Sequence, residues 1–170
     1  MRRGVGLLAG VMVLALLATG CDVSTYAFKV DESIDIVEPK ARAEIDLPVS
    51  IRWTDSRAPG TRRVAPQDPT AEYYAVFVDR AALAPGRRLS SLVDRRERCQ
   101  PRQGCPTAEQ LADLRTYLDA GQSLVLDFIT DRRASSRGDS KDVHEVTLVR
   151  MRGDRRIGET AFLQTFFVRR

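Results

Sequence analysis

The sequence predicts an all-β protein, an antiparallel β-sandwich of about seven strands with one short helix, behind an N-terminal signal helix. Three observations support this prediction. Apolar and polar residues alternate with a period of two through much of the chain, as in strands with one buried face. Loops rich in Pro, Gly and Arg separate these segments. After the N-terminal apolar run a helix signal occurs at one place, and 170 residues are enough for one domain with its own core.

The first 20 residues have the features of an export signal. Met1–Arg3 begins the chain with positive charge, and the run Gly4–Gly20 has no charge. A permanent transmembrane helix needs about 20 apolar residues, whereas a basic start, a short apolar centre and a small-residue cleavage site are typical of a signal peptide. The expected organisation is a signal peptide at 1–20, a lipidated tether at 21–25 and a β-sandwich domain at 26–170.

The segment Leu17-Ala18-Thr19-Gly20-Cys21 resembles the lipobox of bacterial lipoproteins. The family prefers Leu three places before the Cys; here Ala18 has that place and Leu17 lies one residue further back. The resemblance implies that Cys21 becomes the first mature residue and receives the lipid, palmitate included. It also implies an exported protein, anchored in the cell membrane or outer membrane and facing the periplasm or the cell exterior. The alternative is an uncleaved anchor with an incidental Cys.

Removal of the signal peptide also changes the charge balance. It takes away Arg2 and Arg3, so 25 of the 27 basic residues remain against 23 acidic ones. The basic balance of the full chain is therefore partly a targeting feature. No nucleic-acid partner is expected, since an exported protein rarely meets one.

Alternation predicts strands along the rest of the chain. It is clearest from Ile45 to Trp53, where Pro48 removes a main-chain donor and favours an edge position or a bulge. Glu72–Arg80 is apolar on both faces, which predicts a central strand covered on both sides. Arg152–Arg156 is expected to be a hairpin turn. The predicted strands are 26–30 continuing into 34–36, then 45–53, 72–80, 123–130, 143–151 and 157–168.

The one helix signal after the signal peptide begins at Thr107. Thr107 and Gln110 have the spacing of a capping box, and Leu111 and Leu114 follow at helical spacing. Residues 116–119 either continue this helix or begin a hairpin; the pattern leaves both open.

The cysteine pattern agrees with export. Cys99 and Cys105 flank a loop that contains Pro and Gly, which in an oxidising compartment predicts a disulfide. Zinc would need two more ligands, and His144 is the only histidine. A redox pair usually has two residues between its cysteines, and five lie here. No metal and no cofactor are expected.

The run Pro48–Trp53, followed by Tyr74–Val78, resembles strands B and C of fibronectin type III and related immunoglobulin-like modules. In that family a Trp ends one strand and packs against an alternating Tyr/Val strand of the facing sheet. The resemblance covers about half of the mature chain and implies an immunoglobulin-like or fibronectin III-like sandwich. The segment 87–118, with its cysteines and helix, is longer than such modules normally carry between strands.

Motifs for catalysis are missing from the sequence. It contains no serine-hydrolase elbow, zinc-protease His pair, Walker loop or dinucleotide fingerprint. We interpret His144 and Glu145 as a surface pair, so no catalytic residue is assigned and the chain is not expected to be an enzyme.

Two features indicate binding instead. Seven arginines face two acids between Arg80 and Arg102, and such a cluster can hold phosphate or carboxylate groups. The alternative is a solvated face in an Arg-rich chain. Arg-Gly-Asp also occurs at 137–139 and 152–154, although turns select Gly and Asp for backbone reasons alone. The residues assigned to anion or partner binding are Arg87, Arg88, Arg95, Arg96 and Arg98.

The leading interpretation is a membrane-anchored envelope lipoprotein that acts as a non-enzymatic binding or structural module. Its expected partners are the membrane, through acylated Cys21, and an envelope protein or anionic envelope polymer. The alternative is an envelope hydrolase or small-ligand carrier on the same scaffold. These classes differ in geometry, because an enzyme needs a deep cleft with converging polar groups.

Overall fold

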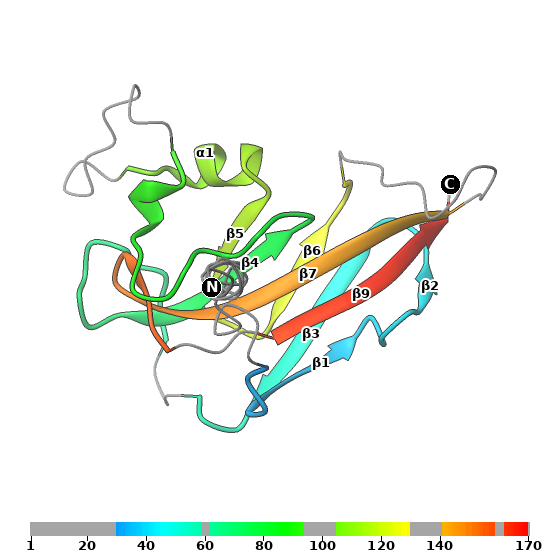
Figure 1. The fold of residues 1–170 in the computed structure, drawn as a ribbon, viewed down its shortest axis with the longest axis horizontal. Coiled ribbons are helices and arrows are strands. Elements are labelled where there is room, and N and C mark those ends of the chain that lie inside the picture. The colour runs from blue at the N-terminus through cyan, green and yellow to red at the C-terminus, as the bar shows by residue number, and fades with distance from the viewer. Residues whose placement is uncertain (1–29, 59–61, 94–104, 130–140, 159–161, 170) are drawn as a thin grey trace, which may run out of the picture.

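Two β-sheets face each other in the computed structural model of this chain (Figure 1). Within the described residues these sheets contain nine strands, two of them only two residues long, and there is one short α-helix. The predicted all-β class is confirmed. The signal peptide, Cys21 and residues 26–29 of the strand expected at 26–30 lie outside the described residues. The structure describes residues 30–58, 62–93, 105–129, 141–158 and 162–169.

The smaller sheet has the strand order β1-β3-β6, and both of its pairs are antiparallel. Its strands are β1 (Ile34–Glu38), β3 (Val49–Asp55) and β6 (Ser123–Leu126). Buried and exposed residues alternate without a fault along β3, as its sequence predicts.

The larger sheet has the strand order β2-β9-β7-β4-β5, and β8 pairs with the end of β7. All pairs are antiparallel except β2 and β9, which run parallel. The prediction of an antiparallel sandwich is therefore wrong at the edge strand β2, which runs in the same direction as β9. The strands are β2 (Glu44–Ile45), β4 (Glu72–Val78), β5 (Thr116–Asp119), β7 (Lys141–Arg152), β8 (Arg155–Arg156) and β9 (Phe162–Arg169).

The segment predicted as one strand from Ile45 to Trp53 is divided between the two sheets. Ile45 pairs with β9, whereas β3 begins at Val49 and pairs with β1 and β6. Pro48 has no N–H to give to a sheet, and Leu47 is 44% exposed. The prediction of one continuous strand is therefore wrong, and the irregularity expected at Pro48 takes the form of a change of sheet.

The capping box predicted at Thr107 is present and begins helix α1 (Ala108–Asp113). Gln110 N donates to Thr107 Oγ1 (3.2 Å), and Thr107 N donates to Gln110 Oε1 (2.9 Å). Arg115 follows the helix with a φ of 51°, and β5 begins at the next residue. Residues 116–119 form β5 and do not continue the helix. Because β5 and β6 lie in different sheets, the two strands do not form a hairpin either, so neither alternative for 116–119 is right.

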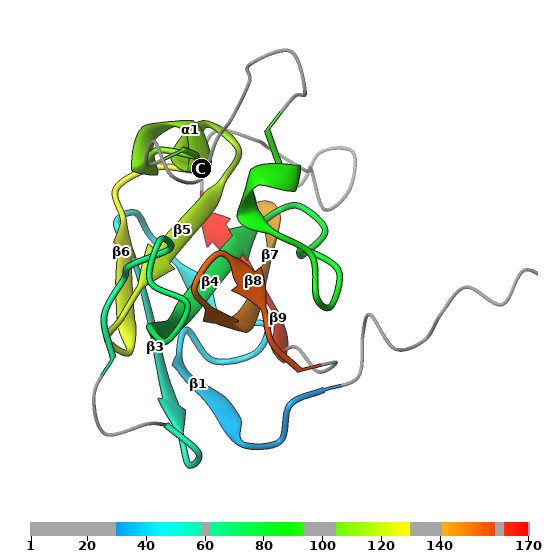
Figure 2. The same cartoon turned by 90° about the vertical axis from the view of Figure 1, so that its left-hand side faces the viewer.

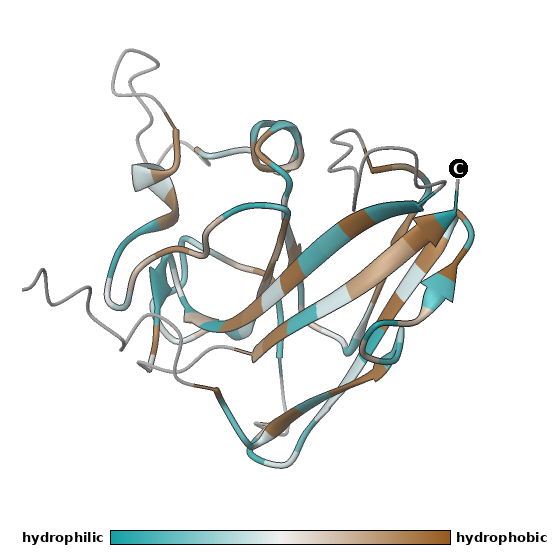
Figure 3. Cartoon of the chain, turned by 45° about the vertical axis from the view of Figure 1, so that its right-hand side comes forward, coloured by the Kyte–Doolittle hydropathy of each residue, from teal (hydrophilic) through white to brown (hydrophobic). Residues whose placement is uncertain are grey.

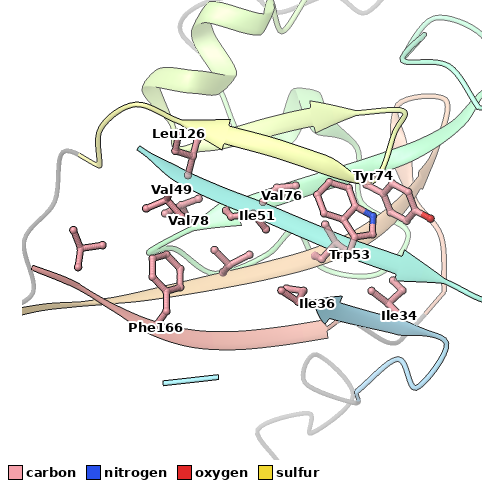
Figure 4. Packing of buried hydrophobic residues seen from close by; sticks show 13 residues of the cluster. Ile34, Ile36, Val49, Ile51, Trp53, Tyr74, Val76, Val78, Leu126 and Phe166 are labelled. Atoms are coloured by element: carbon pink, nitrogen blue, oxygen red, sulfur yellow. The ribbon is translucent and has the colours of Figure 1, made fainter. Parts of the chain in front are cut away.

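Two apolar cores flank β4, so its predicted burial on both faces is confirmed. Residues of β4 alternate between the two cores, and Figure 3 shows hydrophobic and hydrophilic bands alternating along the strands. The inter-sheet core (Figure 4) contains Ile34, Ile36, Val49, Ile51, Trp53, Tyr74, Val76, Val78, Leu126, Val146, Leu148, Phe166 and Val168. The outer core contains Tyr73, Ala75, Phe77, Leu83, Leu89, Leu111, Val149 and Met151.

The described residues of both cores lie between Ile34 and Val168. A chain that begins at Asp22 therefore contains all of them. Within the described ranges, no helix is long and apolar enough to cross a membrane.

Candidate functional site

Arg87 and Arg88, two of the five arginines assigned to anion binding, lie exposed beside the turn between β7 and β8. Main-chain hydrogen bonds hold this segment against the turn, so its position is fixed by the fold. They run from Gly86 N to Arg156 O (3.1 Å), from Leu89 N to Asp154 O (2.8 Å) and from Arg156 N to Arg87 O (3.0 Å). The other three assigned residues lie outside the described residues: Arg95, Arg96 and Arg98.

A pocket of about 400 Å³ opens beside this turn, and we call it the arginine pocket. Arg88, Arg152 and Arg155 line it together with Asp154. Arg88 and Arg155 face each other across an isolated β-bridge, which places their side chains on the same side. The sequence predicted Arg88 but missed Arg152 and Arg155, because they belong to a hairpin much later in the chain.

The arginine pocket has an excess of positive charge. Arg152 Nε donates to Glu72 Oε1 (2.8 Å), and Arg88 Nη1 lies 3.5 Å from Asp154 Oδ2. Arg155 Nη1 donates to a main-chain carbonyl (3.1 Å), and no carboxylate of the described residues forms an ion pair with it. Asp154 is thus the one carboxylate among the described residues that line the pocket, against three arginines, and Glu72 pairs with Arg152 from outside the lining.

The Arg-Gly-Asp tripeptide at 152–154 forms the turn beside this pocket. Gly153 has a φ of 53°, its N–H donates to Ala71 O (2.9 Å), and its carbonyl accepts a hydrogen bond from the Tyr73 hydroxyl. A Cβ at this position would lie 3.1 Å from a main-chain oxygen. Backbone geometry therefore explains the glycine. The tripeptide at 137–139 lies outside the described residues.

His144 is buried, so its interpretation as a surface pair with Glu145 is wrong. His144 Nδ1 lies 2.7 Å from Asp79 Oδ2, and Glu145 N donates to Asp79 Oδ1 (2.9 Å). The imidazole also lies against the ring of Phe166, with 5.8 Å between centroids. His144 lines neither the arginine pocket nor the groove described below. We interpret the Asp79–His144 contact as a buried link between the end of β4 and β7.

An apolar groove lies between α1, β5 and β6, and the sequence did not predict it. Two adjoining hollows of about 490 Å³ and 340 Å³ form the groove and share Ala112 and Tyr117. Val125 (60% exposed) and Phe128 (68% exposed) lie in the smaller hollow, and Val64 lines the larger one. Figure 2 shows α1, β5 and β6 along one side of the fold. Exposed apolar side chains gathered around a concave surface are typical of binding sites.

A strand edge lies beside this groove that no described residue pairs with, because within the described ranges β6 pairs only with β3. Trp53 N donates to Gln122 O (3.0 Å), and hydrogen-bonded and non-bonded positions alternate along an antiparallel pair. With this phase, Ser123 and Val125 direct their main-chain N–H and C=O groups away from β3. The Ser123 N–H is hydrogen-bonded to the Asp119 carboxylate, so Val125 is the position that offers both groups to a further strand. The groove therefore combines apolar side chains with the outward main-chain groups of Val125, and an extended segment can add to such an edge.

Charged and polar side chains link the two sheets close to the arginine pocket, and we call them the Arg150 cluster. Arg150 Nε donates to Asp55 Oδ2 (2.9 Å) and Arg150 Nη1 donates to Asp31 Oδ2 (2.6 Å). Tyr74 Oη donates to Asp55 Oδ2 (2.6 Å), and Ser33 Oγ donates to Asp31 Oδ1 (2.7 Å). Burial raises the pKa of Asp55, but hydrogen bonds from Arg150 and Tyr74 outweigh it and hold this pKa below its usual value. Asp55 is therefore ionised at neutral pH.

Only one cysteine of the predicted disulfide lies among the described residues. Cys105 Sγ lies 3.6 Å from Gln110 Oε1, next to the start of α1. Cys99 lies outside the described residues, so the bridge stays a prediction. In the part of the chain that the structure describes, no three His, Cys, Asp or Glu side chains are grouped to hold a metal ion.

Comparisons with protein-family models, with curated proteins and with solved structures gave no match. The function is therefore argued from the residues and geometry of this chain.

Proposed function

We propose that this chain is an exported lipoprotein, acylated at Cys21, that serves as a non-enzymatic contact module of the cell envelope. The observation that supports the contact role best is the apolar groove beside the edge of β6 that no described residue pairs with. An extended segment of an envelope protein would add to β6 as a further strand and place its apolar side chains in the groove. Main-chain hydrogen bonds would supply affinity, and the two hollows would supply specificity.

The strand order supports an immunoglobulin-like form of this module. Such sandwiches have strands A, B and E in one sheet and strands G, F and C in the other, with C′ added beside C in variable-type domains. Here β1, β3 and β6 correspond to A, B and E, and β9, β7, β4 and β5 correspond to G, F, C and C′. Trp53 of β3 packs edge-on against Tyr74 of β4, with 5.3 Å between ring centroids, in agreement with the resemblance to strands B and C.

The alternative role as a hydrolase has less support. The groove is lined mainly by apolar side chains, and the single histidine is buried against Asp79 away from it. A small apolar ligand carried in the groove is the remaining alternative, and the cross-linking experiment below separates it from a protein partner.

The anchor is tested by metabolic labelling with a clickable palmitate in a bacterial host that processes lipoproteins. We expect the full chain to take up label, because the Cys21 thiol accepts the lipid, and Cys21→Ser to take up none. Cys105→Ser is the matched control and should keep its label. Label on Cys21→Ser would contradict acylation at this residue.

The contact surface is tested by placing a photo-cross-linking amino acid at Phe128 in the full chain. We expect an adduct with an envelope protein from this position and none from Leu163, an exposed residue of β9. Val125→Glu should lower the adduct yield by about tenfold. It removes one apolar contact that the partner would bury in the complex, which contributes about 1.5 kcal/mol. Equal adducts from both positions, or a yield that Val125→Glu leaves unchanged, would contradict a contact at the groove.

A further inference from the structure

We propose that the arginine pocket contacts anionic phospholipid headgroups of the membrane in which the chain is anchored. This inference rests on the proposed lipid anchor and deepens it, because it names the surface that faces the bilayer.

The chain enters the described fold at the same end as the arginine pocket. Val30 is the first described residue, and Asp31 accepts a hydrogen bond from Arg150 (2.6 Å). Arg150 lies on β7 two residues before Arg152, which lines the pocket. Figure 2 looks at this end, with β8 in front. Because β7 has 12 residues, its two ends are about 40 Å apart, and the pocket lies at the end nearer to the tether.

The tether is short enough to keep this end near the headgroups. Residues 22–30 separate Cys21 from Asp31, and a fully extended chain of this length spans at most about 35 Å. With Cys21 acylated, the end of the fold at Asp31 cannot move further than this from the bilayer. Such confinement raises the effective concentration of headgroups, so weak contacts suffice for binding.

The charges of the pocket suit a phosphate group. Arg88 and Arg155 face each other across a β-bridge, and like charges in this position repel. A phosphate between the two guanidinium groups would offset the repulsion and accept paired hydrogen bonds from them. Arg87 lies exposed in the adjoining position, with no acidic partner among the described residues. Asp154 offsets only part of this charge.

The test uses residues 22–170, which contain the described residues of both cores but lack Cys21 and cannot be acylated. At low salt we expect this chain to sediment with vesicles of phosphatidylcholine and phosphatidylglycerol and not with phosphatidylcholine alone. Physiological salt should weaken the binding. Arg87→Gln combined with Arg155→Gln should lower the partition coefficient by about 25-fold, since each arginine near an anionic surface contributes about fivefold. Asp154→Asn should raise it by about fivefold for the same reason.

The matched control is Arg42→Gln combined with Arg52→Gln, which removes the same charge from other exposed positions. This variant should stay within about twofold of the unaltered chain, because neither arginine lines the pocket and Arg52 is paired with Glu38 at the surface. An equal loss in both double variants would overturn the proposal, since net charge alone would then explain the binding. Absence of binding to phosphatidylglycerol vesicles at low salt would also overturn it. Circular dichroism confirms that each variant is folded.

A soluble anion is the other source of the same chemistry. If inorganic phosphate perturbs the NMR signals of the pocket arginines while vesicles do not bind, the site takes a soluble anion and the headgroup proposal is wrong. Because the vesicle assay uses an unacylated chain, its failure leaves the palmitate experiment unaffected. Conversely, loss of the palmitate result would remove the anchor without changing the vesicle result.

Discussion

Replacing Arg150 with methionine should lower the free energy of unfolding by about 3–5 kcal/mol at neutral pH. Arg150 hydrogen-bonds Asp31 and Asp55, whose carboxylates are buried. Methionine fills a similar volume but leaves Asp55 without a cationic partner among the described residues, with hydrogen bonds only from Tyr74 and the Arg57 N–H. Asp31 keeps its ion pair with Arg57, so most of the loss comes from Asp55. Asp55 is the last residue of β3 and Asp31 precedes β1, both strands of the smaller sheet, whereas Arg150 lies on β7 of the larger sheet. The variant therefore also loses a link between the two sheets.

The effect of Arg150→Met should depend on pH. In the unaltered chain the pKa of Asp55 is lowered, so the stability it contributes is present above the unfolded carboxyl pKa of about 3.9 and is lost as the pH falls through the lower folded pKa. In the variant the Arg150 hydrogen bond, which lowers the pKa of Asp55, is lost, whereas burial, which raises it, remains. The pKa of Asp55 is therefore higher than in the unaltered chain, and protonation relieves the buried charge at a higher pH. The stability difference between the two chains is therefore largest near neutral pH and decreases below about pH 4.

Urea unfolding of both chains near neutral pH and in acid measures this difference. Arg152→Met is the matched control, because Arg152 lies on the same strand but pairs with Glu72 at the surface. It should cost less than about 1 kcal/mol, as exposed ion pairs do. Equal losses in the two variants, or a loss in Arg150→Met that acid leaves unchanged, would contradict a buried cluster.

Local patterns predicted those parts of the fold whose cause lies within a few residues. The alternation of apolar residues located β3, β4 and β7, because each has at least one face in a core. The capping box at Thr107 located α1, because both of its hydrogen bonds are made within four residues. The same alternation placed Ile45 and Val49 in one strand, since a change of sheet at Pro48 leaves the period intact.

Contacts between distant segments decided what the sequence did not predict. His144 can be buried because its imidazole pairs with Asp79, which lies 65 residues earlier in the chain. The residues next to His144 in the sequence do not indicate this partner. The arginine pocket brings Arg88 together with Arg155. The basic segment at 80–102 contains Arg88 but not Arg155, so the sequence predicted only one side of the pocket. The groove was missed because the strand predicted at 123–130 included Phe128, whereas β6 ends at Leu126 and Phe128 is exposed.

Replacing Trp53 with alanine should lower the free energy of unfolding by about 3–5 kcal/mol. The indole is fully buried between the two sheets, and its ring plane makes an angle of 81° with that of Tyr74. Figure 4 shows the two side chains next to each other. Alanine would leave a cavity at the point where β3 packs against β4, next to the Tyr74–Asp55 hydrogen bond (2.6 Å). For a domain of this size the melting temperature should fall by about 10 °C.

Trp53→Phe separates the volume of the side chain from its polar atom. Trp53 Nε1 is buried and donates to no acceptor among the described residues, so phenylalanine removes an unpaired donor along with part of the volume. We therefore expect Trp53→Phe to cost about 1 kcal/mol, well below the alanine variant. Unfolding is followed by far-ultraviolet circular dichroism, because Trp53 is the only tryptophan and fluorescence is lost with it. If Trp53→Phe lowers the free energy of unfolding as much as Trp53→Ala does, the volume of the side chain does not explain the loss. A hydrogen bond from Trp53 Nε1 would then be what stabilises this part of the core, which would contradict the prediction.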